Sequence, residues 1–266
     1  LNIFMIPVFL LTYNEADLFT HMYPDDFVNT HFKPNDIEFH VLDNGNQPKM
    51  REWCERHGYF YYATEYNIGS SGGYNWIFKA AYMRGFKHAI LMQADVEMTS
   101  ATPLIKTYGL LLANGANSFI CWPQELWGHW LDNPGQMRPF EQVVNLGNLV
   151  GFYPQTVVAK GCFFDENFVV THYDDVEFIQ WLNLNKLMTV VNAAGTFPNK
   201  QYYTRFEQGY PVTLSKTFNI EGEDFLLKIH HASINIEFET KGIRDSHSPW
   251  QEFNRPVSYT HLRAHE

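Results

Sequence analysis

Short apolar runs recur through the first part of the chain, and polar residues follow each run directly. The runs are Ile3–Thr12, Ile37–Leu42, Tyr59–Thr64 and His88–Gln93. Helical patterns separate them at Gln47–His57, which Gly58 stops, and at Tyr74–Arg84, which Gly85 stops. Strands that alternate with helices at this spacing predict βαβ units. We therefore expect an α/β fold, built on a Rossmann-like, mostly parallel sheet with helices on both faces.

The second half of the chain has a less regular pattern. We expect helices over Pro103–Asn114 and Thr156–Lys160, and strands over Phe119–Trp122, Asn148–Tyr153 and Leu187–Val191. A further helix is expected to begin at Asp174 or Asp175 and to run to about Asn185, because apolar residues recur there at helical spacing. After Asn192 the signals weaken.

The composition excludes several classes of protein. The 266 residues are 45% hydrophobic and 18% charged, which excludes a disordered or fibrous chain. Lys+Arg 19 against Asp+Glu 29 gives a net charge of −10, the opposite of what phosphate contacts need, so we expect no nucleic-acid partner. The three cysteines show no CxxC spacing, which argues against disulfides and cysteine zinc sites and indicates a reducing, cytoplasmic compartment. The 17% aromatic content fits a carbohydrate or nucleotide surface as well as an ordinary core.

No segment of the given sequence has the pattern of a membrane-spanning helix. No stretch approaches the ~18 uninterrupted apolar residues of a membrane helix, so we expect no transmembrane segment. A peripheral contact with the inner face of the membrane stays open. The last residues, Val257–Glu266, resemble the translation of a transposase adapter used to build sequencing libraries. We expect them to be non-native and the natural chain to continue past Pro256; a genuine polar tail is the alternative.

Polar side chains follow the predicted strands at the points where they end. They are Asn14, Asp43, Asn67 and Asp95. Ligands of open α/β sheets bind beyond the carboxyl ends of the strands. This convergence predicts a functional site at that edge of the sheet.

Several motifs occur in a fixed order along the chain. They are Val8–Glu15 (VFLLTYNE), Asp43–Gly45 (DNG), Asn67–Asn75 (NIGSSGGYN), the strand end at Asp95, and Phe164–Phe168 (FDENF) followed by Tyr173–Glu177 (YDDVE). Together they resemble a family 2 glycosyltransferase of the GT-A fold, closest to its galactofuranosyl- and rhamnosyltransferase-like branch, from about Pro7 to Val191. The resemblance implies an inverting enzyme that moves a sugar from a UDP- or dTDP-sugar donor to a hydroxyl of a glycan or lipid-linked acceptor. It also implies a catalytic, nucleotide-sugar-binding domain over 1–200, with 201–256 as a C-terminal extension of it.

The resemblance assigns the donor nucleotide to the first motifs. Asp43 would contact the base, with Thr12 and Asn14 lining the base and ribose pocket. The structural alternative for Asp43 is a turn aspartate that bonds its own backbone. The loop that follows would serve the diphosphate through Asn67, Gly69, Gly72, Gly73 and Asn75. Its alternative is a plain strand-to-helix connection.

The resemblance implies a divalent cation, Mg²⁺ or Mn²⁺, which bridges donor phosphates through hard oxygen ligands. GT-A enzymes normally present Asp-x-Asp at this strand end. Here Gln93 stands in the first position and Asp95 in the second, and one step later Asp95 and Glu97 form an acid-x-acid pair. Asp95 and Glu97 are therefore the metal candidates, and Gln93 puts metal dependence in question.

The catalytic base is implied at Asp174–Asp175, where the resembling family uses the second acid. Asp175 is the first candidate and Asp174 the second; the alternative role is that of a helix N-cap. His230, His231 and His247 are metal ligands only by default, and ordinary solvated histidines are the alternative. The loop tryptophans Trp122, Trp127 and Trp130 would stack on an acceptor sugar or pack the loop onto the sheet.

Two rival functions follow from the same residues. Gln93 also fits a degenerate transferase that binds nucleotide-sugar or glycan without turnover. A nicotinamide dehydrogenase is disfavoured, because no GxGxxG follows the first strand.

Overall fold

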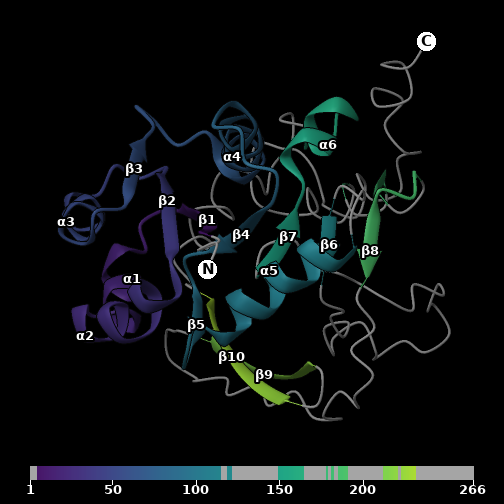
Figure 1. The fold of residues 1–266 in the computed structure, drawn as a ribbon. Coiled ribbons are helices and arrows are strands. Elements are labelled where there is room, and N and C mark those ends of the chain that lie inside the picture. Colours follow the sequence, from purple (N-terminus) through teal and green to yellow (C-terminus); the bar gives the residue numbers. More distant parts are fainter. Residues whose placement is uncertain are drawn as a thin grey trace, which may run out of the picture.

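The computed structural model describes residues 5–114, 119–121, 149–164, 178, 181–182, 185–190, 212–220 and 223–231. Its main sheet has seven strands in the order β3-β2-β1-β4-β7-β6-β8 (Figure 1). In chain order these are β1 (Ile6–Thr12), β2 (Ile37–Asp43), β3 (Phe60–Ala63), β4 (Ala89–Gln93), β6 (Phe119–Cys121), β7 (Leu149–Phe152) and β8 (Met188–Val190). Neighbours are parallel except at β7, which is antiparallel to both β4 and β6. The expected mostly parallel sheet is confirmed.

Helices cover both faces of this sheet (Figure 1). One face carries α1 (Ala16–Met22), α3 (Pro48–His57) and α5 (Thr102–Asn114), and the other carries α4 (Gly69–Met83) and α6 (Pro154–Ala159). The alternation of β1 explains the division: Val8 and Leu10 pack with the first group, whereas Phe9 and Leu11 pack with the second. A strand buried on both faces reads as one continuous apolar run, which is why the sequence predicted it. The predicted α/β class with helices on both faces is confirmed.

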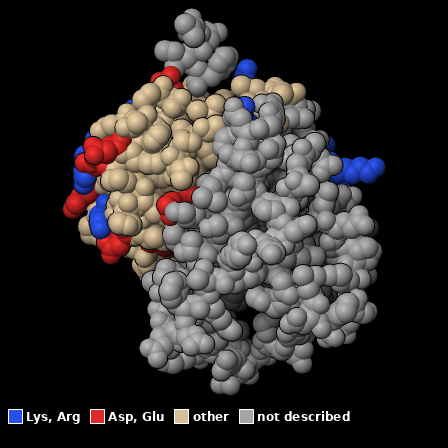
Figure 2. All heavy atoms as spheres, turned by 90° about the horizontal axis from the view of Figure 1, so that it is seen from below, with Lys and Arg blue, Asp and Glu red and all other residues tan. Residues whose placement is uncertain are grey.

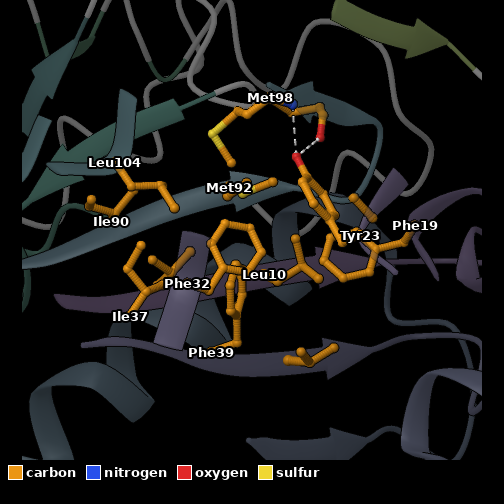
Figure 3. Close-up of a cluster of buried hydrophobic side chains, with 14 of the residues drawn as sticks. Leu10, Phe19, Tyr23, Phe32, Ile37, Phe39, Ile90, Met92, Met98 and Leu104 are labelled. Atoms are coloured by element: carbon orange, nitrogen blue, oxygen red, sulfur yellow. Dashed lines mark hydrogen bonds between the residues drawn. The ribbon is translucent and has the colours of Figure 1, made fainter. Parts of the chain in front are cut away.

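Three short helical elements lie between α1 and β2, where the sequence predicted nothing. They are α2 (Asp25–Phe27), η1 (Val28–Phe32) and η2 (Lys33–Asn35). Phe32 is fully buried and packs against Phe39 of β2, with ring centroids 5.1 Å apart. Figure 3 shows both rings in the cluster that also holds Phe19 and Tyr23. This segment therefore contributes to the core of that face.

A second, antiparallel sheet has the order β5-β10-β9 and was not predicted. Its strands are β5 (Val96–Met98), β9 (Val212–Ile220) and β10 (Glu223–His231). β5 follows β4 almost directly along the chain, and its three residues are too few to give a pattern. β9 and β10 form a hairpin in which Ile220 is opposite Glu223. An alternation of apolar and polar residues does run through β9, and it was the signal for this strand.

Helix α4 begins at Gly69, five residues before the predicted start at Tyr74. The expectation of a loop through Gly73 is therefore wrong. Glycine and serine are weak helix formers, so propensity alone argued against this turn. Packing outweighs propensity here: a Cβ on Gly73 would lie 2.6 Å from Cδ1 of Leu11, so glycine lets the helix approach β1 without displacing that side chain.

The remaining predicted elements agree closely with the structure where it describes them. α5, β6, β7, α6 and β8 lie within two residues of their predicted bounds. Residues 178, 181 and 182 of the helix expected from Asp174 or Asp175 are helical, and its start lies outside the described residues. Within the described part of the chain, no helix is long and apolar enough to cross a membrane.

The described surface carries charges of both signs close together. In the view of Figure 2, acidic and basic side chains are interspersed along one border of the described part of the surface. Two of the ion pairs are Lys49–Asp17, at 2.6 Å, and Arg56–Asp25, at 2.9 Å. Such exposed pairs contribute little to stability.

Candidate functional site

The parallel register brings the ends of three strands together. Thr12 at the end of β1 pairs with Asp43 at the end of β2, and Leu11 pairs with Gln93 at the end of β4. The residue after β2 stays bonded to the end of β1, since the N–H of Asn44 donates to the carbonyl of Thr12 at 2.9 Å. The polar residues expected after these strands therefore share one edge of the sheet.

Asp43 is fully buried and holds a turn. Its Oδ1 accepts a hydrogen bond from the N–H of Gly45 at 2.8 Å. Its Oδ2 accepts from the N–H of Gln47 at 2.6 Å and from the hydroxyl of Tyr61 at 3.0 Å. These contacts correspond to the turn-stabilising alternative for Asp43. They leave the predicted contact with a nucleotide base as a proposal.

The turn at Asp43–Gln47 is joined to the loop after β1. Asn14 adopts a left-handed backbone conformation, with φ 59°, and its Oδ1 accepts from Nε2 of Gln47 at 3.2 Å. The Oε1 of Gln47 accepts from the N–H of Ala16 at 2.7 Å, at the start of α1. A Cβ on Gly45 would lie 2.8 Å from Oδ1 of Asn14, so the two loops approach this closely only because that residue is glycine. Asn14 is exposed at this edge.

The start of α4 is tied to the same edge by Asn44. Its Nδ2 donates to the carbonyl of Gly69 at 3.0 Å, and its Oδ1 accepts from the hydroxyl of Thr64 at 3.3 Å. Asn67 stabilises the turn before the helix, because its Oδ1 accepts from the N–H of Gly69 at 2.8 Å. The first turn of α4 thus lies beside the ends of β1 and β2. Asn44 was not among the predicted site residues, although it lies within the DNG motif.

Two of the predicted diphosphate residues, Gly72 and Gly73, are buried within α4, as is Asn75. Asn75 is 3% exposed, and its side-chain amide contacts the backbone of Phe164: Nδ2 donates to the carbonyl at 2.9 Å and Oδ1 accepts from the N–H at 2.8 Å. The structure therefore gives Asn75 a link to the chain after α6.

The acidic pair lies beyond β4. Asp95 is 7% exposed and occupies the turn between β4 and β5, and Glu97 is half-buried in β5. Gln93, which stands where an acid was expected, donates from Nε2 to the hydroxyl of Tyr74 at 2.5 Å. This side chain is therefore bonded to α4.

Glu15 belongs to this edge and was not singled out from the sequence. The pKa of Glu15 is raised to about 8, mainly by burial, next by the charge of Asp95 and least by the charge of Asp43. The N–H of Tyr13 and the hydroxyl of Thr12 act in the opposite direction, at 3.4 and 3.5 Å from Oε2. The signal was present, since Glu15 follows β1 directly. A carboxyl whose pKa is raised by burial and by neighbouring carboxylates marks an edge with excess negative charge.

The oxygen ligands present fit one kind of cation site. Within the described ranges, no group of three or more His, Cys, Asp or Glu side chains could hold a metal ion. Mg²⁺ is commonly held by one or two carboxylates together with the phosphates of a substrate, and carboxylate oxygens suit Mn²⁺ equally. Asp95 and Glu97 are compatible with that mode and not with a metal site made by the protein alone.

Several predicted residues cannot be placed. Asp174, Asp175 and the preceding Asp165–Glu166 lie outside the described residues, as do Trp122, Trp127, Trp130 and His247. His230 and His231 lie at the end of β10, opposite Thr213 and Val212 of β9. Their roles stay predictions.

No protein-family model matches the chain, and no curated protein sequence matches it. Solved structures with a similar fold include the mannosyltransferase PcManGT from Pyrobaculum calidifontis, solved with GDP-Man and Mn²⁺, which is 16% identical over 70% of this chain and 54% of that chain, with a TM-score of 0.49. TarS from S. aureus is 15% identical over 71% of this chain and 58% of that chain, with a TM-score of 0.49. The chain spans little more than half the length of either protein. A likeness of this degree assigns no residue and no activity to this chain.

Proposed function

We propose that the chain is an inverting glycosyltransferase that takes a sugar from a UDP- or dTDP-linked donor. The observation that carries the proposal is the gathering of Thr12, Asp43 and the start of α4 at one edge of a mostly parallel sheet. This is the edge at which α/β sheets bind ligands. The order of the motifs along the chain, which resembles that of family 2 glycosyltransferases, supports it independently.

The nucleotide would lie against the loop after β1 and the turn at Asp43–Gln47. Thr12 and Asn14 are proposed as contacts to the base and ribose. Asp43 would form part of the wall of this pocket, because its hydrogen bonds hold the turn in place. The diphosphate would face the first turn of α4, because the dipole of a helix attracts negative charge to its N-terminus. Asn67 and Asn44 hold this turn in place from either side.

Asp95 and Glu97 would hold Mg²⁺ or Mn²⁺ together with the donor's phosphates. The cation, when bound, offsets the negative charge that develops on the leaving diphosphate. The protein would supply two carboxylates beyond β4. Gln93 would not bind the cation, because its side chain is bonded to Tyr74. The net charge of −10 makes such local compensation necessary.

Asp175 is proposed as the catalytic base. It would accept the proton of the acceptor hydroxyl while that oxygen attacks the anomeric carbon from the side opposite the diphosphate. The bond between the anomeric carbon and the phosphate oxygen breaks in the same step, so the configuration inverts. Asp174 would cap the helix that follows. The acceptor is a sugar hydroxyl of a glycan or a lipid-linked sugar.

Calorimetry and a transfer assay test this proposal. We expect UDP to bind more tightly with Mn²⁺ than without it, and a panel of UDP- and dTDP-sugars to identify the donor by its thermal shift. Asp175→Asn should abolish transfer and leave UDP binding unchanged, whereas the neighbouring Asp174→Asn should keep most of the activity. Transfer by Asp175→Asn at the wild-type rate would remove the assignment of the base. A protein that binds no nucleotide would remove the proposed function.

A second candidate is a protein that binds nucleotide-sugar or glycan without turnover. The bond between Gln93 and Tyr74 favours it, because an amide engaged with a helix is a poor substitute for the first acid of Asp-x-Asp. This candidate predicts UDP binding that is indifferent to Mn²⁺ and no product with any acceptor. The same calorimetry therefore separates the two functions.

A further inference from the structure

Tyr23, at the end of α1, is held rigidly inside the core. Its side chain is fully buried, and its ring lies 4.9 Å from Phe19 and 5.3 Å from Phe32, centroid to centroid. Its carbonyl accepts a hydrogen bond from the indole Nε1 of Trp53 at 2.9 Å. The position of the phenolic oxygen is thereby fixed by α1, η1 and α3 together.

The phenolic oxygen contacts the backbone of β5 at two points (Figure 3). It donates to the carbonyl of Val96 at 2.6 Å and accepts from the N–H of Met98 at 3.1 Å. Backbone groups of residues two apart in a strand point to the same edge. The hydroxyl therefore takes the place that a neighbouring strand would take, and it leaves the opposite edge of β5 for β10, which pairs with it from Val96 to Met98.

This contact determines where the acidic residues lie. Val96 and Met98 are buried, at 0% and 2% exposure, so their side chains face the core beside Tyr23. Side chains alternate along a strand, so that of Glu97 is directed to the opposite side, and Asp95 enters the strand from the preceding turn. The phenol holds one edge of this three-residue strand, and β10 holds the other.

We propose that Tyr23 is a positioning residue for the acidic segment Asp95–Glu97: its hydroxyl fixes the backbone of β5 and, through it, the placement of both carboxylates toward the donor diphosphate and its cation. Only the second half of this inference, the placement of the carboxylates toward the diphosphate and its cation, rests on the proposed function. The first half, the fixing of β5, is independent of any ligand. Nothing in the sequence pointed to this role, because Tyr23 is 73 residues from Val96.

The charges around Tyr23 keep the hydroxyl able to donate. Burial holds the pKa of Tyr23 well above its usual range; the N–H of Met98 acts in the opposite direction, and the charges of Glu97 and Asp95 raise the pKa further. A deprotonated phenol would lose its bond to the carbonyl of Val96. Burial is the main reason that the phenol keeps its proton.

Amide hydrogen exchange tests the first half of the proposal. In the wild-type protein the N–H of Met98 should exchange as slowly as the core amides of β1. Tyr23→Phe keeps the ring and removes the hydroxyl, and it should speed exchange at Met98 about tenfold while leaving β1 unchanged. Tyr153→Phe is the matched control, because its hydroxyl donates to the carbonyl of Leu111 at 2.6 Å in the same core cluster. It should leave Met98 unchanged.

Calorimetry with UDP and Mn²⁺ tests the second half. Tyr23→Phe should raise the Kd of UDP in the presence of Mn²⁺ about tenfold, with the Kd in chelator unchanged, since partners of ligand-bearing groups commonly affect metal affinity to this degree. Tyr153→Phe should leave both values at wild type. Equal Mn²⁺ dependence in the two variants would overturn the positioning role toward the cation.

The outcomes also separate this inference from the proposed function. A wild-type protein that binds no UDP with Mn²⁺ overturns the proposed function and the second half, while exchange at Met98 still decides whether Tyr23 fixes β5. If Tyr23→Phe does not fold, the wild-type exchange rate decides: a Met98 amide that exchanges as fast as an exposed one overturns the role of the hydroxyl.

Discussion

Asn75 and Phe164 exchange two hydrogen bonds, Nδ2 to carbonyl at 2.9 Å and N–H to Oδ1 at 2.8 Å. The side-chain amide of Asn75 thereby satisfies both the backbone N–H and the backbone carbonyl of Phe164, as a neighbouring strand would. Both residues are 3% exposed and 89 residues apart along the chain. The bonds join α4, whose first turn lies at the candidate site, to the segment that leads into the FDENF motif.

Removing this amide should be costly. Asn75→Ala leaves the N–H and the carbonyl of Phe164 buried without that partner, and we expect the free energy of unfolding to fall by about 2 kcal/mol or more. Asn35→Ala is the control, because Asn35 donates to the carbonyl of His31 at 2.7 Å on the surface. It should cost less than about 0.5 kcal/mol. Urea denaturation measures both, and equal losses would contradict the importance of burial.

Gly73 should not tolerate a side chain. In Gly73→Ala the new Cβ would lie 2.6 Å from Cδ1 of Leu11, so either the buried side chain of Leu11 or α4 must shift. We expect a loss of about 1–3 kcal/mol. Gly109→Ala makes the same change in α5, where nothing lies within 4 Å of the Cβ, and should stabilise by about 0.5–1 kcal/mol. Thermal unfolding of the two variants should therefore shift in opposite directions.

Glu15 should make stability depend on pH. Its pKa is raised from 4.5 to about 8, so between these values the folded protein keeps a proton that the unfolded chain releases. The contribution of this group is thus fully present below pH 4.5 and is lost as the pH rises toward 8. Glu15→Gln removes the charge and keeps the shape, so its stability relative to wild type should increase from pH 5 to pH 8.

The exposed Glu52→Gln on α3 provides the control for Glu15→Gln. The difference between their pH profiles therefore reports on Glu15 together with Asp95 and Asp43, the carboxylates whose charges act on it. A difference between Glu15→Gln and wild type that does not change with pH would show that Glu15 is ionised throughout in the folded protein.

The sequence predicted the elements whose own residues carry their signal. β1 is one apolar run because it is buried on both faces, and α3 begins at Pro48 and ends before Gly58, whose φ is 73°. The first turn of α4 was mispredicted because glycine and serine disfavour helices, and its stabilising contacts come from Leu11 and Asn44. Propensity does not include such contacts.

The residues of the candidate site likewise differ in whether a local sequence pattern indicates them. Strand ends indicated Asn14, Asp43 and Asp95, because polar residues that follow apolar runs are visible in the sequence. The contact of Tyr23 with Met98 spans 75 residues and leaves no local pattern. The bond between Asn75 and Phe164 spans 89 residues and likewise leaves no local pattern, while the predicted contact of Asn75 with the diphosphate stays a prediction.

Asp43 allows the most discriminating substitution at the site. Its carboxylate accepts from two backbone N–H groups and from Tyr61, and Asp43→Asn would direct an NH₂ donor at one of these donors. We expect the variant to lose about 1–3 kcal/mol of stability. Tyr61→Phe removes one of the three bonds and leaves the carboxylate intact, so it should cost about 1 kcal/mol. Urea denaturation should therefore rank Asp43→Asn below Tyr61→Phe, and the reverse order would contradict the turn-stabilising role.

Calorimetry with UDP on both variants then separates the two roles of Asp43: a loss of affinity beyond that of Tyr61→Phe assigns a direct contact with the base, and an equal loss limits the residue to holding the turn.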